Sequence, residues 1–302
     1  MFQLSRKNHL ARNLMKMSKE FPHEYKFYPK TFLLPQDFNE FKKVFQNKQN
    51  GKTPVFIVKP EASCQGKGIF LTDNYEDLKP NSHYVAQQYI KKPLLIDGLK
   101  FDCRLYVLVQ SIDPLTIYLF NEGLARFSTV DYEQPSKKNF NNLFMHLTNY
   151  AINCKNQGVF KFNEDLENSS QGHKRTYSSI LDHIRNTFED GDDRVFQLEK
   201  NIEQIIIRTL CTVQPSIRRY LQMPAKFEWL DTYNEPKDSI CFELLGFDIL
   251  IDAKLKPWLI EINHTPSFAT DTPLDFKIKK DLIADTFQLL DMQSSKKKEY
   301  LR

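Results

Sequence analysis

Residues 240–263 read ICFELLGFDILIDAKLKPWLIEIN, and this stretch decides the fold. Two apolar runs flank the polar segment 252–256, a pattern that predicts an antiparallel β-hairpin with its turn at that segment. The turn places Asp248 roughly opposite Glu261. A buried carboxylate lowers stability unless a partner satisfies it, so the two acids in this hairpin need a physical explanation.

Side chains alternate between the two faces of a strand, which separates the polar from the apolar residues of the hairpin. On the second strand, Glu261 and Asn263 share one face, and Ile260 and Ile262 share the other. Asp248, Glu261 and Asn263 are therefore expected to converge on one side of the sheet. Two carboxylates and an amide, without sulfur or an imidazole pair, are ligands that suit Mg²⁺. The alternative is a set of surface carboxylates on a solvated face.

A glycine-rich loop interrupts the sequence FIVKPEASCQGKGIF, residues 56–70. The strand delivers Lys59, and the loop then offers Gln65, Gly66, Lys67 and Gly68. Glycine lets backbone N–H groups approach phosphate oxygens, and lysine adds positive charge. The loop is not a Walker A motif, because GK[ST] and a following helix are missing. Glycine is scarce, with 9 in 302 residues, so two at one loop tip favour a phosphate cradle over a plain hairpin turn.

Charged residues alternate with apolar ones along the strand LKFDCRLYV, residues 99–107. Lys100, Asp102, Arg104 and Tyr106 point to one face of this strand, and apolar residues point to the other. We interpret the charged face as a wall of a cleft for polyphosphate and metal. A charge ladder on the surface of a sheet is the alternative.

The composition is that of a globular protein, with 41% hydrophobic and 26% charged residues. No run approaches about 18 apolar residues, so no membrane span is expected. A net charge of +4 without basic–aromatic motifs argues against nucleic acid, although a basic face would suit an acidic protein partner. The five cysteines form no CxxC pair, which predicts reduced intracellular thiols rather than disulfides or structural zinc.

The rest of the chain predicts an α+β protein with antiparallel sheets. Helices are expected at residues 1–21, 36–46, 194–222 and 275–291. Strands are expected at residues 53–60, 69–73, 83–90, 99–111 and 115–128. Pro215 is expected to kink or split the third helix. Residues 131–179 are polar and loop-like.

Six stretches resemble, in this order, the tubulin tyrosine ligase-like family. They are KPEASCQGKGIFL, QQYIKKPLLIDGLKFDCRLYVLV, YLFNEGLARFS, HLTNYAIN, ELLGFDILID and PWLIEINHTPSF with the following TD and LD. The resemblance covers about residues 6 to 291 and is greatest to the elongating polyglutamylases, with Thr265 in place of a usual serine. It implies an ATP-grasp fold in which antiparallel sheets hold ATP between two lobes.

The resemblance implies three groups of site residues. ATP would contact Lys59, Gln65, Gly66, Lys67, Gly68, Gln87, Gln88, Tyr89, Ile90, Lys100, Asp102, Thr148 and Asn149. Free L-glutamate would contact Arg126, Tyr150, Lys174 and Lys279, and Mg²⁺ would bind Asp248, Glu261 and Asn263. Cationic side chains suit the two carboxylates of glutamate. Arg104 and Glu261 are the candidate catalytic residues, Arg104 through charge stabilisation in the transition state, and His264 would line the acceptor site.

The activity implied by the resemblance is an ATP- and Mg²⁺-dependent ligase that activates a glutamate carboxylate as an acyl phosphate and joins free L-glutamate to it. The expected acceptors are glutamate side chains or chains on tubulin C-terminal tails, and the expected enzyme is a cytoplasmic monomer on microtubules of the cytoskeleton, in a cilium or basal body. The alternatives are a tyrosine or glycine ligase, a ligase for small molecules or another acidic protein, and a non-catalytic microtubule-binding regulatory module. The sequence leaves open the choice between α- and β-tubulin and between initiation and elongation.

Four segments are expected along the chain. They are a remnant of an N-terminal lobe with a linker (1–50), a central lobe with the glycine-rich hairpin (51–92), a C-terminal lobe with the metal and amino-acid sites (93–292) and a basic tail (293–302). Compared with the family, part of the N-terminal lobe is expected to be missing. A long basic extension of the kind found in elongating relatives is likewise expected to be missing, which bears on microtubule activity more than on ATP binding.

Overall fold

Two antiparallel sheets organise the chain in the computed structural model, which describes residues 2–46, 53–61, 66–79, 81–163, 171–221 and 241–290. The strands are β1 (Thr31–Leu34), β2 (Phe56–Pro60), β3 (Phe70–Thr72), β4 (Tyr84–Gln88), β5 (Leu95–Ile96), β6 (Leu99–Ile112), β7 (Leu115–Phe127), β8 (Lys174–Thr176), β9 (Glu243–Ile251) and β10 (Pro257–Asn263). The helices are α1 (Phe2–Ser5), α2 (Lys7–Glu20), α3 (Phe38–Gln46), α4 (Leu143–His146), α5 (Tyr150–Asn153), α6 (Tyr177–Thr187), α7 (Gly191–Leu221) and α8 (Pro273–Leu289). The α+β class with antiparallel sheets is confirmed.

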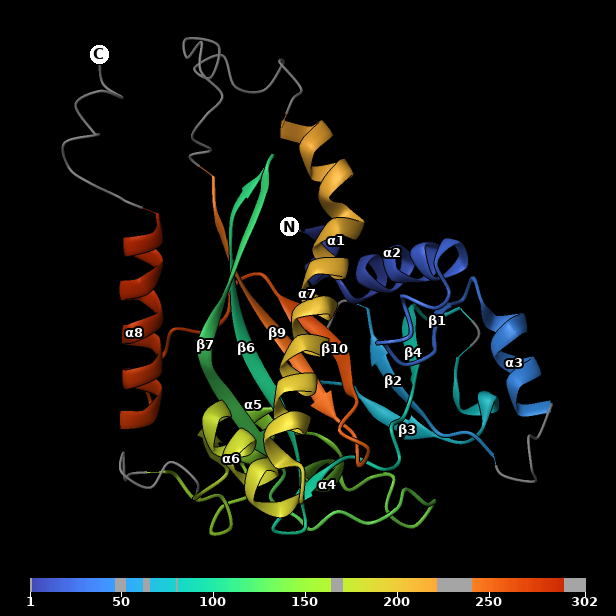
Figure 1. The fold of residues 1–302 in the computed structure, drawn as a ribbon. Coiled ribbons are helices and arrows are strands. Elements are labelled where there is room, and N and C mark those ends of the chain that lie inside the picture. Colours follow the sequence, from blue (N-terminus) through green and yellow to red (C-terminus); the bar gives the residue numbers. More distant parts are fainter. Residues whose placement is uncertain are drawn as a thin grey trace.

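The smaller sheet has the strand order β1-β4-β2-β3 and is covered by α3 (Figure 1). Aromatic rings fix this contact: the ring centre of Phe41 on α3 lies 5.4 Å from that of Phe32 and 4.9 Å from that of Phe56. Edge-to-face rings at such distances combine a large buried area with a favourable geometry. Since β1 pairs with β4, one sheet continues across residue 50, where the sequence suggested a division between segments.

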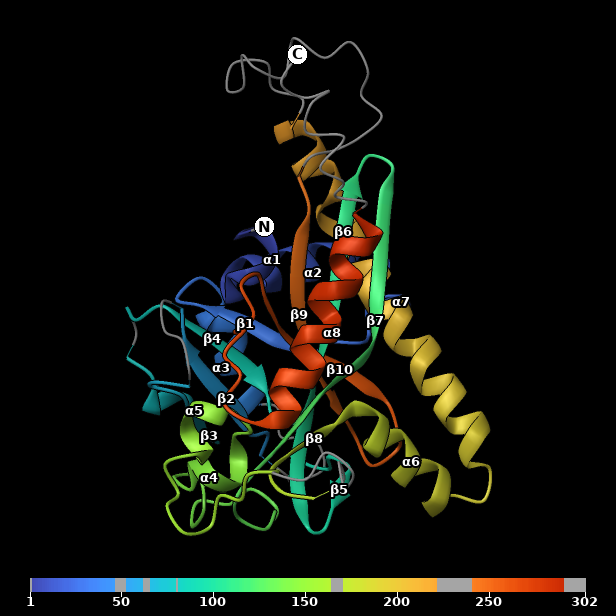
Figure 2. The same ribbon diagram turned by 90° about the vertical axis from the view of Figure 1, so that its left-hand side faces the viewer.

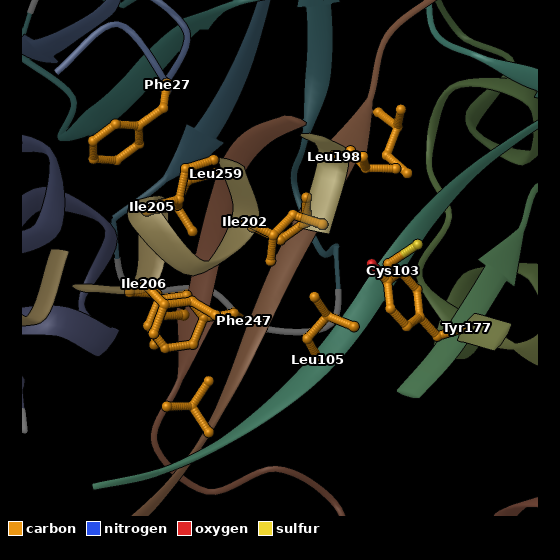
Figure 3. Packing of buried hydrophobic residues seen from close by; sticks show 14 of the residues in the cluster. Phe27, Cys103, Leu105, Tyr177, Leu198, Ile202, Ile205, Ile206, Phe247 and Leu259 are labelled. Atoms are coloured by element: carbon orange, nitrogen blue, oxygen red, sulfur yellow. The ribbon is translucent and has the colours of Figure 1, made fainter. Parts of the chain in front are cut away.

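The larger sheet has the order β10-β9-β6-β7-β8, with β5 paired to β6. One face of it carries the main hydrophobic core, which the long helix α7 covers (Figure 1). Figure 3 shows Ile202 and Ile206 of α7 beside Leu105 and Phe247 of the sheet. Strand alternation then directs the polar residues of β6 and β9 to the opposite face.

That opposite face is divided between a second apolar cluster and a charged region. Helix α8 packs against β6 and β7 (Figure 2), and its Leu274, Ile278 and Leu282 bury Tyr106 and Leu124. Charged residues of β6, β7 and β9 continue along the same strands, beginning with Arg104, which pairs with Leu124 of this cluster. They face the smaller sheet, so the functional candidates lie between the two sheets.

The predicted hairpin is confirmed, because β9 and β10 pair with Glu261 opposite Asp248 and Asn263 opposite Gly246. One detail differs: the register shifts between Leu259 and Glu261. Ile260 occupies this β-bulge and lines the cleft instead of facing the core, and Leu259 takes the core position. A bulge adds one residue and re-aims the side chains that follow, so the expectation that Ile260 shares the core-facing side with Ile262 was wrong.

One expectation about helices needs correction, and for another the structure excludes one of the two expected outcomes, the splitting of a helix at Pro215. The single helix expected at residues 1–21 is two helices that meet at Arg6, because α1 packs on β10 while α2 packs on β1 and α7. Helix α7 continues through Pro215 without being split. Val213 is buried in the core and the Gln214 side chain donates a hydrogen bond to the Ile112 carbonyl, so tertiary contacts hold the turn that proline weakens.

Short elements also lie in the stretch that was expected to be loop, namely α4, α5 and β8. In the described part of the chain, no helix is long and apolar enough to cross a membrane. Among the described residues, Cys103, Cys154 and Cys211 are free thiols. The expected basic tail at 293–302 lies outside the described residues.

Candidate active site

A cleft of about 870 Å³ opens between the two sheets. The smaller sheet contributes Lys59 and Gln87, and the larger sheet contributes its charged face. Fifteen of the residues predicted from the sequence line this cleft: Lys59, Gly66, Gln87, Gln88, Tyr89, Ile90, Lys100, Asp102, Arg126, Thr148, Asn149, Asp248, Glu261, Asn263 and His264. Residues separated by about 200 positions in the sequence therefore meet at one site.

Six predicted residues lie outside the lining, and one lies outside the described residues. Lys67 and Gly68 are exposed at the loop tip, and Arg104 lies behind Asp248. Tyr150, Lys174 and Lys279 form a separate cluster that is described below. Gln65 falls in a part of the chain that the structure does not describe.

A chain of carboxylates and guanidinium groups forms the floor of the cleft. Arg126 donates to both oxygens of Asp102, at 2.8 Å and 2.6 Å, and to Asp248 Oδ2 at 2.8 Å. Arg104 donates to both oxygens of Asp248, with Nη2 2.9 Å from Oδ2. Burial opposes ionisation of Asp248, but Arg104 and Arg126 outweigh it and hold the pKa of this carboxyl well below its usual range. Asp248 is therefore an anion that two arginines hold in place.

Glu261 is the acid in this floor without an arginine partner in the described structure. Burial and the neighbouring charge of Asp248 raise the pKa of Glu261, while Lys59 opposes the shift. The Asn263 amide lies 3.5 Å from Asp248 Oδ2. Asp248 is buried and Glu261 is partly buried; two such carboxylates side by side are a costly arrangement, and a divalent cation between them would remove that cost.

The donor set fits a hard cation such as Mg²⁺. Each carboxylate oxygen has two lone pairs, so Asp248 retains acceptor capacity beside its arginines, and Glu261 and Asn263 add further oxygens. No group of three His, Cys, Asp or Glu side chains that could hold a metal occurs among the described residues. A metal here would thus depend on the Asn263 amide and on non-protein ligands, as is usual for Mg²⁺.

Two buried lysines face the cleft, and the hydrogen-bond acceptors that the described residues offer them are neutral. Lys59 Nζ donates to Gln87 Oε1 at 3.0 Å. Lys100 Nζ donates to the Tyr89 hydroxyl at 3.1 Å and to the His146 carbonyl at 2.6 Å. Neither lysine forms an ion pair with a carboxylate within the described ranges.

Burial lowers the pKa of both amines. The pKa of Lys59 falls although Glu261 opposes the shift, and that of Lys100 falls to about 7, with Asp102 opposing and Lys59 adding to the shift. A buried ammonium that lacks a carboxylate partner is costly. An anionic ligand in the cleft would supply the missing charge to both lysines.

The glycine-rich loop packs on the segment that carries Thr148 and Asn149. Gly66 has a φ of +77°, which favours glycine. A Cβ at this position would collide with the Ile152 side chain of α5. The glycine-rich loop and the segment around Thr148 are distant in sequence. They can approach each other at the cleft because Gly66 has no side chain.

Tyr150, Lys174 and Lys279 gather around Asp275, a residue that the sequence did not single out. Lys174 Nζ lies 2.6 Å from Asp275 Oδ2, and Lys279 Nζ lies 3.2 Å from Oδ1. The Lys174 ammonium also lies 4.2 Å from the ring centre of Tyr150. We name these four residues the Asp275 cluster. The cluster adjoins the cleft, because Lys174 of β8 is the cross-strand neighbour of Arg126 of β7, and Arg126 lines the cleft.

Two parts of the site were not predicted from the sequence: one wall of the cleft and a buried histidine. Ser5, Arg6, Lys7 and Asn8, where α1 meets α2, line the cleft, although no motif marks them. His146 precedes the predicted Thr148 in the same motif and is fully buried. At the rim, the His264 ring packs edge-on against Phe2 at 5.4 Å, so the N-terminal helix borders the expected acceptor side.

Comparison with known proteins agrees with this geometry. The model of the tubulin-tyrosine ligase family matches residues 1–299. The chain is 50% identical over 303 residues to a protein named probable beta-tubulin polyglutamylase from Tetrahymena thermophila, covering 100% of this chain and 24% of that protein. It is 43% identical over 301 residues to the human tubulin polyglutamylase TTLL6 and 38% over 304 residues to the human tubulin polyglutamylase TTLL7.

These alignments cover 100% of this chain in both human cases, but only 32% of TTLL6 and 33% of TTLL7. The chain therefore spans about a quarter to a third of the length of these curated relatives. The family model, by contrast, extends over nearly every residue of the chain, including both sheets and all the cleft-lining residues. The chain belongs to the tubulin-tyrosine ligase family.

Proposed function

We propose that the chain is an ATP-dependent protein–glutamate ligase that extends glutamate side chains or chains on tubulin tails. The observation that carries this proposal is the pair of buried lysines, Lys59 and Lys100, which face a large cleft and whose acceptors within the described part of the chain are neutral. Such a pair favours a polyanion such as a nucleotide triphosphate. The names of the relatives, all tubulin polyglutamylases, favour glutamate and tubulin as the other two substrates.

ATP would lie between the two sheets, as in an ATP-grasp fold. Lys59 and Lys100 would contact its phosphates, and the loop around Gly66 with Thr148 and Asn149 would close over them. Gln87 to Ile90 form the end of β4 and the residues after it, and these line the cleft on the smaller sheet. Of the proposed loop contacts, Lys67 and Gly68 are exposed and would approach a phosphate only through movement of the loop tip.

Asp248, Glu261 and Asn263 would hold Mg²⁺. The metal would neutralise phosphate charge at the position where the two carboxylates meet. Arg104 does not line the cleft and binds Asp248 with its guanidinium. We therefore assign Arg104 to the positioning of Asp248, and through it to the metal site.

The reaction forms one bond to phosphorus and then one amide bond. A carboxylate oxygen of the acceptor glutamate attacks the γ-phosphorus, ADP leaves, and an acyl phosphate results. The amino group of free L-glutamate then attacks the acyl carbon, inorganic phosphate leaves, and the amine releases a proton to solvent. Arg126 lines the cleft and would bind a carboxylate of the incoming glutamate, with the Asp275 cluster beside it as the source of a second cation. His264 would line the acceptor side.

Incorporation of labelled amino acids tests the function. The protein incubated with ATP, Mg²⁺, microtubules and labelled glutamate is expected to label tubulin, and labelled glycine and tyrosine are expected not to. Mass spectrometry of the released tails would identify the branch or chain that grows. Labelling by glycine or tyrosine instead would reassign the added residue. Binding to microtubules without labelling by any amino acid would refute the ligase and support a regulatory module.

The affinity for ATP is expected to fall as the pH rises above about 7, because the pKa of Lys100 lies near that value. Phosphate favours the ammonium form, so below this pKa the lysine is already charged, and above it binding must take up a proton. Uptake of one proton weakens affinity by up to about tenfold per pH unit. Asp102, Lys59, Tyr89 and His146 face this amine. Calorimetric titration with ATP between pH 6 and about 9 measures the effect.

The matched control is Lys100→Arg, whose charge does not titrate in this range. It is expected to remove most of the pH dependence and leave only that of ATP itself. An identical pH profile in the wild type and in Lys100→Arg would show that Lys100 does not bind the nucleotide in its ammonium form.

A further inference from the structure

We propose that His146 is a positioning residue for the nucleotide: its neutral imidazole orients the Tyr89 hydroxyl, and the two together hold the Lys100 ammonium toward the cleft. The inference rests on the proposed ATP site and assigns a role to a residue of the motif HLTNYAIN for which none was predicted from the sequence. His146 is fully buried on α4, Tyr89 follows β4, and Lys100 lies on β6. Three separate elements therefore converge on one amine.

The hydrogen bonds determine which ring nitrogen carries the proton. His146 Nε2 lies 3.1 Å from the Asn139 carbonyl, which only accepts, so Nε2 is the N–H nitrogen. Nδ1 is then an acceptor, and it lies 2.9 Å from the Tyr89 hydroxyl. The single hydroxyl proton of Tyr89 is thus donated to His146. The lone pairs of the Tyr89 oxygen face Lys100 Nζ, 3.1 Å away.

His146 holds Lys100 a second time through its backbone. The His146 carbonyl accepts from Lys100 Nζ at 2.6 Å. An ammonium group has three N–H donors, and these two bonds use two of them. The third donor remains for a ligand. Asp102, the carboxylate whose charge raises the pKa of Lys100, already accepts a hydrogen bond from Arg126 at each of its two oxygens.

A charged imidazole would break this arrangement, because both of its nitrogens donate. Burial, with the charge of Lys100, lowers the pKa of His146 to about 4, against the opposing Asn139 carbonyl. The ring is therefore neutral at physiological pH and remains an acceptor. Tyr132 also borders the Tyr89 hydroxyl, but its own hydroxyl proton is donated to the Lys91 carbonyl at 2.8 Å.

Direct measurement of ATP binding with four variants tests the inference. His146→Leu removes the acceptor, and we expect ATP binding to weaken by about tenfold, the size of one hydrogen bond to a charged group. Tyr89→Phe deletes only the hydroxyl and should weaken binding by a similar factor. His146→Asn retains an amide oxygen close to the Nδ1 position and should stay within about threefold of wild type. Tyr132→Phe is the matched control and should bind ATP like the wild type.

A role in packing alone predicts a different pattern. If His146 only packs the core, His146→Leu and His146→Asn should lower thermal stability equally. The Michaelis constants for ATP and for glutamate should then change by the same factor. We expect the constant for ATP to rise and that for glutamate to stay unchanged. If His146→Leu does not fold, Tyr89→Phe still decides the question, since it leaves the core volume intact.

Two results would overturn the inference. Wild-type ATP binding by Tyr89→Phe would show that the hydroxyl does not position Lys100. An equal loss of ATP affinity in Tyr132→Phe and Tyr89→Phe would show that the effect does not depend on the hydrogen bond between Tyr89 and His146. Failure of the wild-type protein to bind ATP is distinguishable from both, because it would refute the proposed function and this inference together.

Discussion

Glu261→Gln is expected to reduce ligase turnover by about 10³-fold while the protein folds as stably as the wild type. Glu261 is partly buried beside Asp248, and burial together with that neighbouring charge raises its pKa. The amide has the same size and removes the repulsion between the two carboxylates, so stability should not fall. A metal ion contributes several kcal/mol of charge stabilisation to a phosphoryl transfer. About 4 kcal/mol corresponds to the expected factor.

Two measurements separate the loss of metal from a loss of fold. Thermal unfolding of Glu261→Gln should match or exceed that of the wild type, and turnover should recover in part at high Mg²⁺ concentration. Glu243→Gln, at the start of β9 and outside the cleft lining, is the control and should remain active. Undiminished turnover by Glu261→Gln would refute the metal assignment, and a large loss of stability would indicate a structural carboxylate.

The strands of the final hairpin were predictable because alternation of side chains is a local rule. Alternation places Glu261 and Asn263 on one face of β10 and keeps Asp248 off the face of Phe247 and Ile249, whereas the register shift between Leu259 and Glu261 is what brings Glu261 opposite Asp248. The same rule placed Lys100 and Asp102 on the face opposite Cys103 and correctly directed them toward the cleft. Positions that depend on strand period alone were therefore accessible from the sequence.

The bulge at Ile260 was not predictable from the same rule. A bulge leaves the composition and the apolar run unchanged, and only the pairing partner reveals the extra residue. The break at Arg6 and the continuous α7 have the same origin, since packing against distant strands overrides local preference. Local pattern therefore determined which segments are strands and helices but not where their contacts shift them.

His146 and Asp275 were missed for a different reason, because each acts through partners that are remote in sequence. Asp275 follows Lys174 by about 100 positions, and nothing in the motif LDFKIK indicates that its aspartate will bind two lysines. His146 lies in a recognised motif, but its partners Tyr89 and Lys100 lie on two other elements. Buried polar networks of this kind become visible only once the fold brings their members together.

Asp275→Asn is expected to destabilise the protein by about 3 kcal/mol, at the lower end of the cost of breaking a buried ion pair. Asp275 is fully buried, and the side chains of Lys174 and Lys279 that bind it are only 9% and 8% exposed. The amide keeps the size of the side chain and an oxygen for the Thr272 hydroxyl that caps α8, but it leaves two buried ammonium groups without a counter-charge. Urea unfolding of the intact chain gives the difference.

A double-mutant cycle tests whether the loss comes from the unpaired lysines. The double variant Lys279→Met/Asp275→Asn should lose less free energy of unfolding than the sum of the losses in the two single variants. The reason is that Lys279→Met removes one of the two buried ammonium groups that Asp275→Asn leaves unpaired. Asp281→Asn, on the exposed face of the same helix, should alter stability by less than about 0.5 kcal/mol. Simple additivity, or a loss below about 1 kcal/mol in Asp275→Asn, would mean that the lysines find other partners. The ion pairs with Asp275 would then not fix the positions of Lys174 and Lys279. The proposal that these lysines lie beside the incoming glutamate would lose its support.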